Sequence, residues 1–284
     1  MTSQTSGLNC HNAQCQYGRR TWLKLWRQPR GIWLNKNWYC GMDCFEQGAI
    51  SEFSGFRLQE EPNKAGRYRF PLGLLMLSKG FLDNQSIQEA LKAQRELQKG
   101  RIGEWLRELG VVTEQQLTTA LGMQWGCPVF HLAQSPGFKE CAQMVPFCIM
   151  ETSRMVPVHF MPTSRALYIA FADGVDFCTM RGIEQMLDCS TRPCVISESE
   201  MSAALETISR MERPQETVLD FPGNFQSLAR EVREWAEINQ AEQVKAVACP
   251  GCFWVRLEGS EAAGNLLFPF EDARSLLNPS SQAL

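Results

Sequence analysis

The sequence has no long apolar segment and no strong excess of either charge. Its longest apolar runs, Leu72 to Leu77 and Leu167 to Ala172, are far shorter than the about 20 residues of a membrane-spanning helix. The first twenty residues have no apolar core, charged residues make up 21% of the chain, and the formal net charge is only -3 over 284 residues. These absences argue against a membrane protein and against a disordered acidic chain, so we expect a globular protein in the cytoplasm.

Cysteine, in contrast, is abundant. A chain of this kind keeps its 12 cysteines as thiols or metal ligands. Cys10 and Cys15 are followed, after 24 residues, by Cys40 and Cys44, and four thiolates satisfy tetrahedral zinc. The spacing predicts a structural zinc site, with His11 as a substitute for Cys10, in a module over residues 1–60. The alternative is four unrelated buried thiols, but a segment so poor in aliphatic residues needs a metal to fold.

The stretch Trp38-Tyr39-Cys40-Gly41-Met42-Asp43-Cys44-Phe45 resembles treble-clef zinc fingers of the FCS or TRASH type. Residues 1–45 also hold six basic side chains against one acidic one. Arginines interleaved with tryptophans can bind nucleic acid, or they can form a solvated face over a tryptophan-filled core. The modest positive excess favours the second interpretation. The residues concerned are Trp22, Trp26, Trp33, Trp38, Arg19, Arg20, Lys24, Arg27, Arg30 and Lys36.

Two copies of one helical unit follow a predicted linker over residues 61–68. In each copy a short apolar helix ends at a glycine suited to a left-handed cap, and Asp83 or Thr113 then caps a longer amphipathic helix. We expect a helical tandem-repeat bundle over residues 69–134. Leu72, Gly73, Gly80, Asp83, Ile87, Leu91 and Gln94 recur thirty residues later as Ile102, Gly103, Gly110, Thr113, Leu117, Leu121 and Gln124.

The rest of the chain alternates strand and helix patterns. Residues 135–212 predict a small α/β subdomain, and residues 213–284 predict a linker, a charged helix over 225–238 and a β-hairpin from Val244 to Phe270. In the subdomain we expect strands over 155–161, 166–172 and 193–196 and helices over 138–143, 176–188 and 199–211. The predicted fold class is therefore multidomain α+β, with a zinc finger, the repeat bundle, the α/β subdomain, and a C-terminal helix and hairpin.

The repeat also supports a family resemblance. Arg101-Ile102-Gly103 is followed by Leu106, Gly110, Leu117, Leu121 and Gln124, and the first copy matches from Leu72-Gly73 to Gln94 but has Pro71 at the arginine position. With the turn Ala172-Asp173-Gly174-Val175-Asp176, residues 69–210 resemble the N-terminal region of the GspE/PulE/PilB-type ATPases of type II secretion and type IV pili. The repeated module of that family is called MshEN.

The resemblance implies a ligand, because some tandem MshEN modules bind cyclic di-GMP. Glycines permit close backbone approach, leucines offer an apolar surface to a purine, and arginine can bind a guanine edge or a phosphate. Proline offers neither a charge nor an N–H, so Pro71 predicts weakened binding unless Arg67 or Arg69 substitutes. The alternative is that the repeat residues only build the bundle. The implied half-sites are Leu72, Gly73, Gly80, Ile87, Leu91 and Gln94, and Arg101, Gly103, Gly110, Leu117, Leu121 and Gln124.

The sequence contains no G-x-x-x-x-G-K-[ST] pattern, so the ATP-hydrolysing half of those relatives is missing. We expect a non-enzymatic signalling adaptor near a secretion or pilus system, with structural zinc, cyclic di-GMP as a candidate ligand, a protein partner and no membrane insertion. Two other interpretations remain open. One is a protein-interaction scaffold without a nucleotide ligand, and the other is a zinc-finger protein that binds nucleic acid.

Several further cysteine, histidine and aspartate residues lie outside the two predicted sites. Cys249-Pro250-Gly251-Cys252 resembles half of a zinc ribbon and is a redox dithiol, a knuckle remnant or part of a shared metal site. His131 and His159 are expected to be structural, without a carboxylate partner, and Asp173 and Asp176 are expected to be turn and capping residues. Core positions are expected for Cys127, Cys141, Cys148, Cys178, Cys189 and Cys194.

Overall fold

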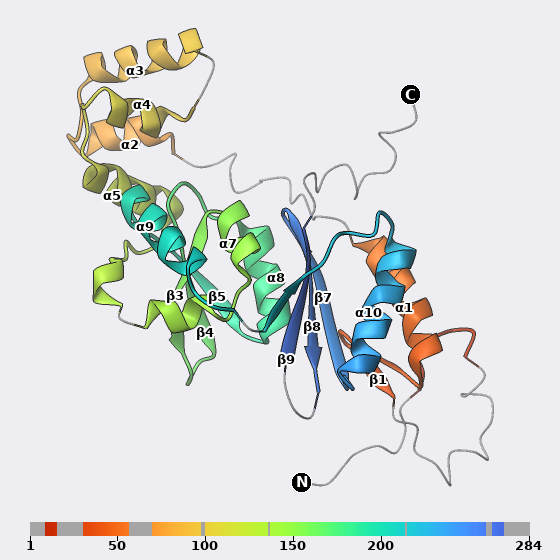
Figure 1. Ribbon diagram of the computed structural model, residues 1–284. Coiled ribbons are helices and arrows are strands. Elements are labelled where there is room, and N and C mark those ends of the chain that lie inside the picture. Colours follow the sequence, from red (N-terminus) through yellow and green to blue (C-terminus); the bar gives the residue numbers. More distant parts are fainter. Residues whose placement is uncertain are drawn as a thin grey trace, which may run out of the picture. The chain divides into compact units, whose positions relative to one another are not determined.

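The computed structural model describes residues 9–15, 31–56, 70–97, 100–135, 137–213, 215–259 and 263–269 (Figure 1). The chain divides into two compact units, one made of Met1–Gln59 and Arg213–Leu284 and the other of Glu60–Glu212. Helices and strands occur in both units, in agreement with the predicted α+β class. Within the described ranges, no helix is both long enough and apolar enough to span a membrane.

The first unit is built on a six-stranded sheet that combines strands from both ends of the chain. Strand β1 pairs in parallel with β7, at Trp33 opposite Gln243 and Leu34 opposite Val244. The predicted finger over residues 1–60 is therefore not separate from residues 213–284. The strands run in the order β2-β1-β7-β8-β9-β6, and they are β1 (Ile32–Leu34), β2 (Asn37–Tyr39), β6 (Glu216–Val218), β7 (Gln243–Cys249), β8 (Cys252–Glu258) and β9 (Ala263–Pro269).

The shared sheet has a physical cause in the shortness of β1. A three-residue strand cannot bury its own apolar side chains, and Ile32 and Leu34 are buried only because they join a core made by distant elements. Helices α1 (Met42–Gly55) and α10 (Phe225–Ile238) pack together over one face of the sheet (Figure 1). This core includes Phe45, Ala49 and Phe53 of α1, Leu228, Val232 and Ala236 of α10, and Val244, Ala246, Phe253, Val255 and Leu266 of the sheet.

The C-terminal strands form a three-stranded meander rather than the predicted hairpin. The β7–β8 pair turns at Gly251, whose φ of 73° suits glycine, and Cys249 pairs with Cys252 across the turn. Strand β9 then returns along β8 over the full length from Ala263 to Pro269. The run Leu266-Leu267-Phe268 is buried, so a third strand completes the apolar layer that two strands leave incomplete.

In the second unit, two copies of a helix pair form the predicted repeat. The first copy is α2 (Leu72–Ser78) and α3 (Asn84–Leu97), and the second is α4 (Ile102–Glu108) and α5 (Glu114–Trp125). Helix α2 packs on α5 and α4 packs on α3, so each short helix contacts the long helix of the other copy. The small core uses matching positions, with Met76 and Leu106 as one pair and Ala90 and Ala120 as another.

The two copies end and begin their helices with the same hydrogen bonds. Gly80 and Gly110 each have a φ of 68°, and the next residue donates its N–H back to the short helix, from Phe81 to Met76 O and from Val111 to Leu106 O. The long helices are capped as predicted, by Asp83 Oδ1 accepting from Ser86 N at 2.8 Å and Thr113 Oγ1 accepting from Gln116 N at 3.2 Å. The predicted local structure of the repeat is therefore correct.

The rest of the second unit is an α/β fold whose elements lie close to their predicted positions. Strands β3 and β4 are antiparallel, and β4 and β5 are parallel with a helical crossover between them. Asp176 caps that crossover helix by accepting from Thr179 N at 3.1 Å, which is its predicted role. The elements are η4 (Leu132–Gln134), α6 (Phe138–Ala142), α7 (Phe147–Thr152), β3 (Met155–Met161), β4 (Ala166–Phe171), α8 (Phe177–Leu187), β5 (Ser190–Val195) and α9 (Glu198–Ser209).

Candidate functional site

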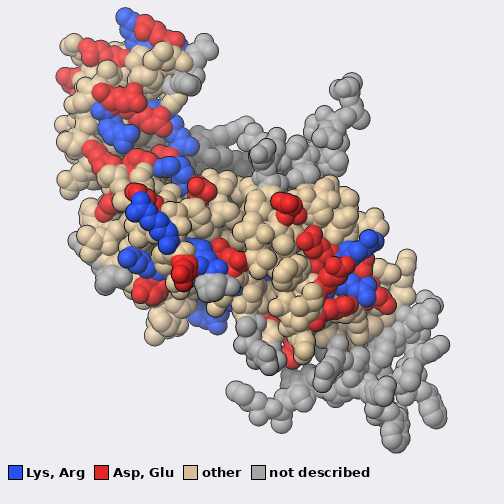
Figure 2. Space-filling model, in the orientation of Figure 1, with Lys and Arg blue, Asp and Glu red and all other residues tan. Residues whose placement is uncertain are grey.

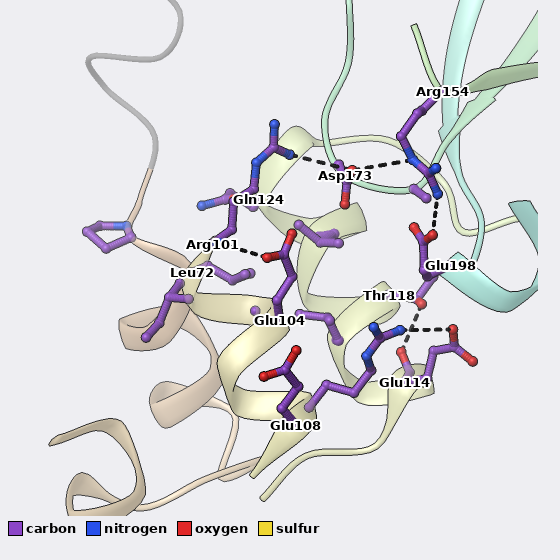
Figure 3. Close-up of a pocket in the computed structure, with 17 residues that line it drawn as sticks. Leu72, Arg101, Glu104, Glu108, Glu114, Thr118, Gln124, Arg154, Asp173 and Glu198 are labelled. Carbon is purple, nitrogen blue, oxygen red and sulfur yellow. Dashed lines mark hydrogen bonds and ion pairs between the residues drawn. The ribbon is translucent and has the colours of Figure 1, made fainter. Parts of the chain in front are cut away.

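A cavity of about 670 Å³ lies in the second unit, where the second copy of the repeat meets the α/β fold (Figure 3). Helices α4 and α5 and the start of α2 form one wall, and residues next to α7, β4 and α9 form the other. Its size suits a nucleotide-sized ligand. The lining residues are Pro71, Leu72, Arg101, Ile102, Gly103, Glu104, Arg107, Glu108, Glu114, Leu117, Thr118, Leu121, Gln124, Arg154, Ala172, Asp173 and Glu198.

Half of the predicted ligand residues line this cavity. They are Leu72, Arg101, Gly103, Leu117, Leu121 and Gln124, and all except Leu72 belong to the second copy. The structure therefore brings together five of the six residues of the expected second half-site. The residues that lie outside the cavity are Gly73, Gly80, Ile87, Leu91, Gln94 and Gly110.

Five of the six residues outside the cavity have structural roles in the repeat. Gly80 and Gly110 provide left-handed caps, and a Cβ at either position would meet nothing within 4 Å. A Cβ on Gly73 would lie 3.8 Å from Cδ1 of Ile87, which packs against α2. Gln94 donates from Nε2 to the carbonyl oxygen of Gly100 at 2.9 Å. These contacts explain why the repeat pattern requires such residues without reference to a ligand.

Gly103 serves both the fold and the cavity wall. An added Cβ would lie 3.0 Å from Cδ1 of Leu117 and 3.5 Å from Cδ2 of Leu72. Leu72 and Leu117 line the cavity, so the absence of a side chain at Gly103 lets these two apolar side chains approach α4. A larger residue at position 103 would displace the side chains of Leu72 and Leu117, which form the apolar part of the cavity wall.

Pro71 and Arg101 occupy matching positions, and the structure shows how the two copies differ there. The backbone N–H of Arg101 donates to Oε2 of Glu104 at 3.0 Å, which closes the first turn of α4. In the first copy Pro71 has no N–H to donate, and the residue that matches Glu104 is Leu74. Pro71 therefore contributes neither charge nor a donor to the cavity, as the sequence predicts. Arg67 and Arg69 lie outside the described residues.

The three arginines of the cavity are all paired with carboxylates (Figure 3). Oδ2 of Asp173 lies 3.9 Å from Arg101 Nη1 and 3.8 Å from Arg154 Nε, and Arg154 also pairs with Glu198. Arg107 Nη1 lies 4.0 Å from Oε1 of Glu114. With five carboxylates and three guanidinium groups, the lining has an excess of acidic side chains. An anionic ligand must therefore compete with groups already present.

Among the charged residues of this lining, only Arg101 was predicted as a ligand contact. Asp173 was expected to be only a turn residue, and Arg154 and Glu198 belong to the α/β fold rather than to the repeat. Arg154 has a φ of 44° between α7 and β3, which turns the chain there. No spacing rule links these residues to the repeat, because their approach depends on the tertiary packing of the unit. His131 also differs from its prediction, since Glu200 Oε1 lies 3.7 Å from its Nδ1.

In the first unit, the structure brings Cys10, Cys15, Cys40 and Cys44 together, with all four sulfur atoms within 4.8 Å of one another. Sγ of Cys40 lies 3.4 Å from Sγ of Cys15 and 3.7 Å from Sγ of Cys44. Tetrahedral zinc with Zn–S bonds of about 2.3 Å requires S–S separations of about 3.8 Å. The residues therefore fit a tetrahedral metal ion with four thiolate ligands.

The surroundings of these thiols also favour a metal. Burial and the neighbouring thiols raise the pKa of Cys40, and burial raises the pKa of Cys44. A divalent cation would reverse this effect by stabilising the thiolates. Cys44 lies in the first turn of α1, where the helix dipole also favours a thiolate. Together the four sulfurs would hold the segment around Cys10 and Cys15 against β2 and α1.

The other candidate ligands do not join this cluster. The ring of His11 stacks edge-on against Tyr39 at 6.2 Å, and in the described part of the chain the four-residue group contains Cys10 and not His11. Cys249 and Cys252 are almost fully buried at the β7–β8 turn and are not in that group. The sequence did not predict this burial of Cys249 and Cys252, which arises because both cysteines lie in strands of the meander.

The basic, tryptophan-rich segment lies mostly outside the described residues, including Arg19, Arg20, Trp22, Lys24, Trp26, Arg27 and Arg30. Of its tryptophans, Trp38 is buried and Trp33 is 37% exposed. On the face shown in Figure 2, basic and acidic side chains of the described residues are mixed rather than separated by sign.

No protein-family model and no curated protein matches this sequence. Among solved structures the chain is similar to MshE with cdg, at 23% identity over 49% of this chain and 99% of that chain, with a TM-score of 0.43. It is also similar to two crystal forms of the N-terminal domain of XpsE, both at 18% identity. One covers 48% of this chain and 92% of that chain with a TM-score of 0.37, and the other covers 52% and 98% with a TM-score of 0.30.

Proposed function

We propose that this chain is a non-catalytic regulatory or adaptor protein whose second unit binds cyclic di-GMP in the cavity between the repeat and the α/β fold. One observation supports this function above all others. Six residues that the family resemblance implies as ligand contacts line a single cavity of about 670 Å³. The family resemblance of the repeat relates the protein to the N-terminal domains of type II secretion and type IV pilus ATPases.

The cavity offers the two kinds of surface that a guanine dinucleotide needs. Leu72, Leu117 and Leu121 form an apolar surface for a purine ring. Arg101 and Arg154, which approach from opposite walls, offer guanidinium groups to a phosphate or a guanine edge. Carboxylates in the same lining can accept from the N1–H and amino group of guanine. Because the first copy has Pro71 in place of arginine, one half of a two-fold ligand is held more strongly than the other.

Calorimetric titration of cyclic di-GMP into the full zinc-loaded chain tests this function. We expect saturable binding that GTP and cyclic di-AMP do not reproduce. Arg101→Ala removes a charge-assisted contact and should weaken binding by about tenfold to a hundredfold. Arg95→Ala is the matched control, because Arg95 is exposed on α3 of the same repeat and does not line the cavity.

The competing function is a protein-interaction scaffold without a nucleotide ligand. Two observations favour it: Pro71 interrupts the symmetry of the repeat, and carboxylates outnumber guanidinium groups in the cavity. In that case cyclic di-GMP produces neither heat nor a shift in the unfolding temperature, even at high concentration. The Arg101→Ala chain would then behave like the parent chain with every nucleotide, and this result would overturn the proposed ligand.

A structural zinc ion in the first unit completes the proposed function. Cys10, Cys15, Cys40 and Cys44 would be its ligands, and the metal would supply folding energy rather than chemistry. The metal site would stabilise the first unit and the cavity would bind the ligand in the second, since the two sites belong to different units.

A further inference from the structure

Asp173 occupies an unusual place in the cavity. It follows β4, and its Oδ2 lies between two guanidinium groups, 3.9 Å from Arg101 Nη1 and 3.8 Å from Arg154 Nε (Figure 3). Arg101 begins α4 of the repeat, whereas Arg154 and Asp173 belong to the α/β fold. A single carboxylate oxygen thus joins an arginine of the repeat to an arginine of the α/β fold.

From this arrangement we infer that Asp173 is an internal competitor, whose carboxylate holds the position that a phosphate of the ligand takes between Arg101 and Arg154. The inference rests on the proposed binding of cyclic di-GMP. A carboxylate and a phosphate are both oxygen anions that guanidinium groups bind in the same way. Binding therefore exchanges one anion for another, and Asp173 sets the affinity of the site.

The ion pairs of Asp173 are suited to such an exchange. Both N···O distances exceed hydrogen-bond length, and the side chains of Arg101 and Asp173 are 67% and 39% exposed. Exposed ion pairs of this kind contribute little to stability. A phosphate can approach both guanidinium groups more closely and can accept from each of them in a bidentate manner.

The other carboxylates near these arginines are held more firmly. Glu114 accepts from both the backbone N and the Oγ of Ser199, each at 2.7 Å, at the start of α9. Glu198 pairs with Arg154 and also accepts from Ser202 Oγ at 3.3 Å. Among the described residues, the contacts of the Asp173 carboxylate are with the two arginines. Asp173 is therefore the carboxylate that a ligand displaces at least cost.

The exchange has a structural consequence within the second unit. The Arg101–Asp173 pair joins α4 to the turn that follows β4, so its loss releases one link between the repeat and the α/β fold. The Glu114–Ser199 contacts form a second link that does not involve Arg101. A ligand that displaces Asp173 thus releases the Arg101–Asp173 pair and leaves the Glu114–Ser199 contacts intact.

The experiment is a titration of cyclic di-GMP into the full chain carrying Asp173→Asn, with Glu151→Gln as the matched control. Glu151→Gln removes the same charge, but Glu151 is exposed on α7 of the same α/β fold and does not line the cavity. We expect Asp173→Asn to bind about five- to tenfold more tightly than the parent chain, and Glu151→Gln to change affinity less than about twofold. Asp173→Ser, which also lacks the charge, should reproduce the gain if the asparagine disturbs the turn.

The outcomes separate this inference from the proposed function. If the parent chain binds cyclic di-GMP and the two Asp173 variants bind equally or more weakly, Asp173 is not a competitor although the ligand is correct. An equal gain in Glu151→Gln would also overturn the inference, since the effect would then be general charge repulsion. Absence of binding in the parent chain and in both Asp173 variants would overturn the ligand itself.

Discussion

Gln94 and Gln124, thirty residues apart, make the same hydrogen bond in opposite copies of the repeat. Gln94 Nε2 donates to the carbonyl oxygen of Gly100 at 2.9 Å, and Gln124 Nε2 donates to that of Phe70 at 2.8 Å. Each acceptor lies just before the arginine or proline that begins a short helix. The long helix of each copy therefore fixes the backbone just before the short helix of the other copy, and the two copies stabilise each other.

This reciprocal contact predicts separate effects for the two glutamines. Gln94→Ala should lower the free energy of unfolding by about 1 kcal/mol and leave the affinity for cyclic di-GMP unchanged, because Gln94 lies outside the cavity. Gln124→Ala should lower both, since Gln124 lines the cavity. Urea unfolding followed by circular dichroism, together with calorimetry, measures the two quantities. Weaker binding in Gln94→Ala would instead make Gln94 a ligand contact.

Two glycines of the first copy should respond to alanine with opposite signs. Gly80 has a φ of 68°, so Gly80→Ala strains the backbone and should destabilise the repeat by about 1 kcal/mol. Gly73 lies inside α2, and an added Cβ would meet nothing closer than Ile87 Cδ1 at 3.8 Å. Gly73→Ala should therefore raise stability by about 0.5 kcal/mol. Urea midpoints of the two variants provide the comparison, and a loss in both would contradict the assigned backbone roles.

The parts of the fold that follow local rules were predictable from the sequence. The left-handed glycines and the caps at Asp83 and Thr113 depend on residues within one or two helical turns, and the structure agrees at each of them. The pairing of β1 with β7 was not predictable, because Trp33 and Gln243 are distant in sequence and no local signal connects them. Removal of residues 1–60 would therefore remove two strands and α1 from a shared core rather than a separate finger.

The candidate site, too, was predictable only where it depends on local sequence. The family resemblance implied Arg101, Leu117 and Gln124 as ligand contacts, but it could not show that the cavity takes most of its repeat residues from the second copy. The opposite wall, with Arg154 and Asp173, comes from the α/β fold and depends on how the two parts pack. Tests of nucleic-acid binding should accordingly substitute basic residues of the N-terminal segment rather than delete it, because deletion also disrupts the first unit.

Stability should fall at alkaline pH because of Cys194. Burial in the apolar core, with Cys127 nearby, raises the pKa of Cys194 from 9.0 to about 12. Between these values the unfolded chain loses the thiol proton and the folded chain keeps it. The stabilisation is therefore fully present below pH 9 and decreases by about 1.4 kcal/mol per pH unit as the pH rises toward 12. Urea unfolding at a series of pH values should show a shallower decrease in Cys194→Ala, and an identical slope in both chains would refute the assignment.

Zinc removal tests the four-cysteine cluster. We expect one zinc ion per chain by elemental analysis, and its loss in Cys15→Ser, because three sulfurs leave the tetrahedral site incomplete. Cys189→Ser is the matched control, since Cys189 is also partly buried but belongs to the second unit. The loss of the metal should destabilise the first unit by about 4 kcal/mol or more, since the cluster joins the segment of Cys10 and Cys15 to β2 and α1. A chelator should reproduce this effect in the parent chain and have none in Cys15→Ser. Retention of zinc by Cys15→Ser, with unchanged stability, would show that these thiols are only neighbours in a folded core.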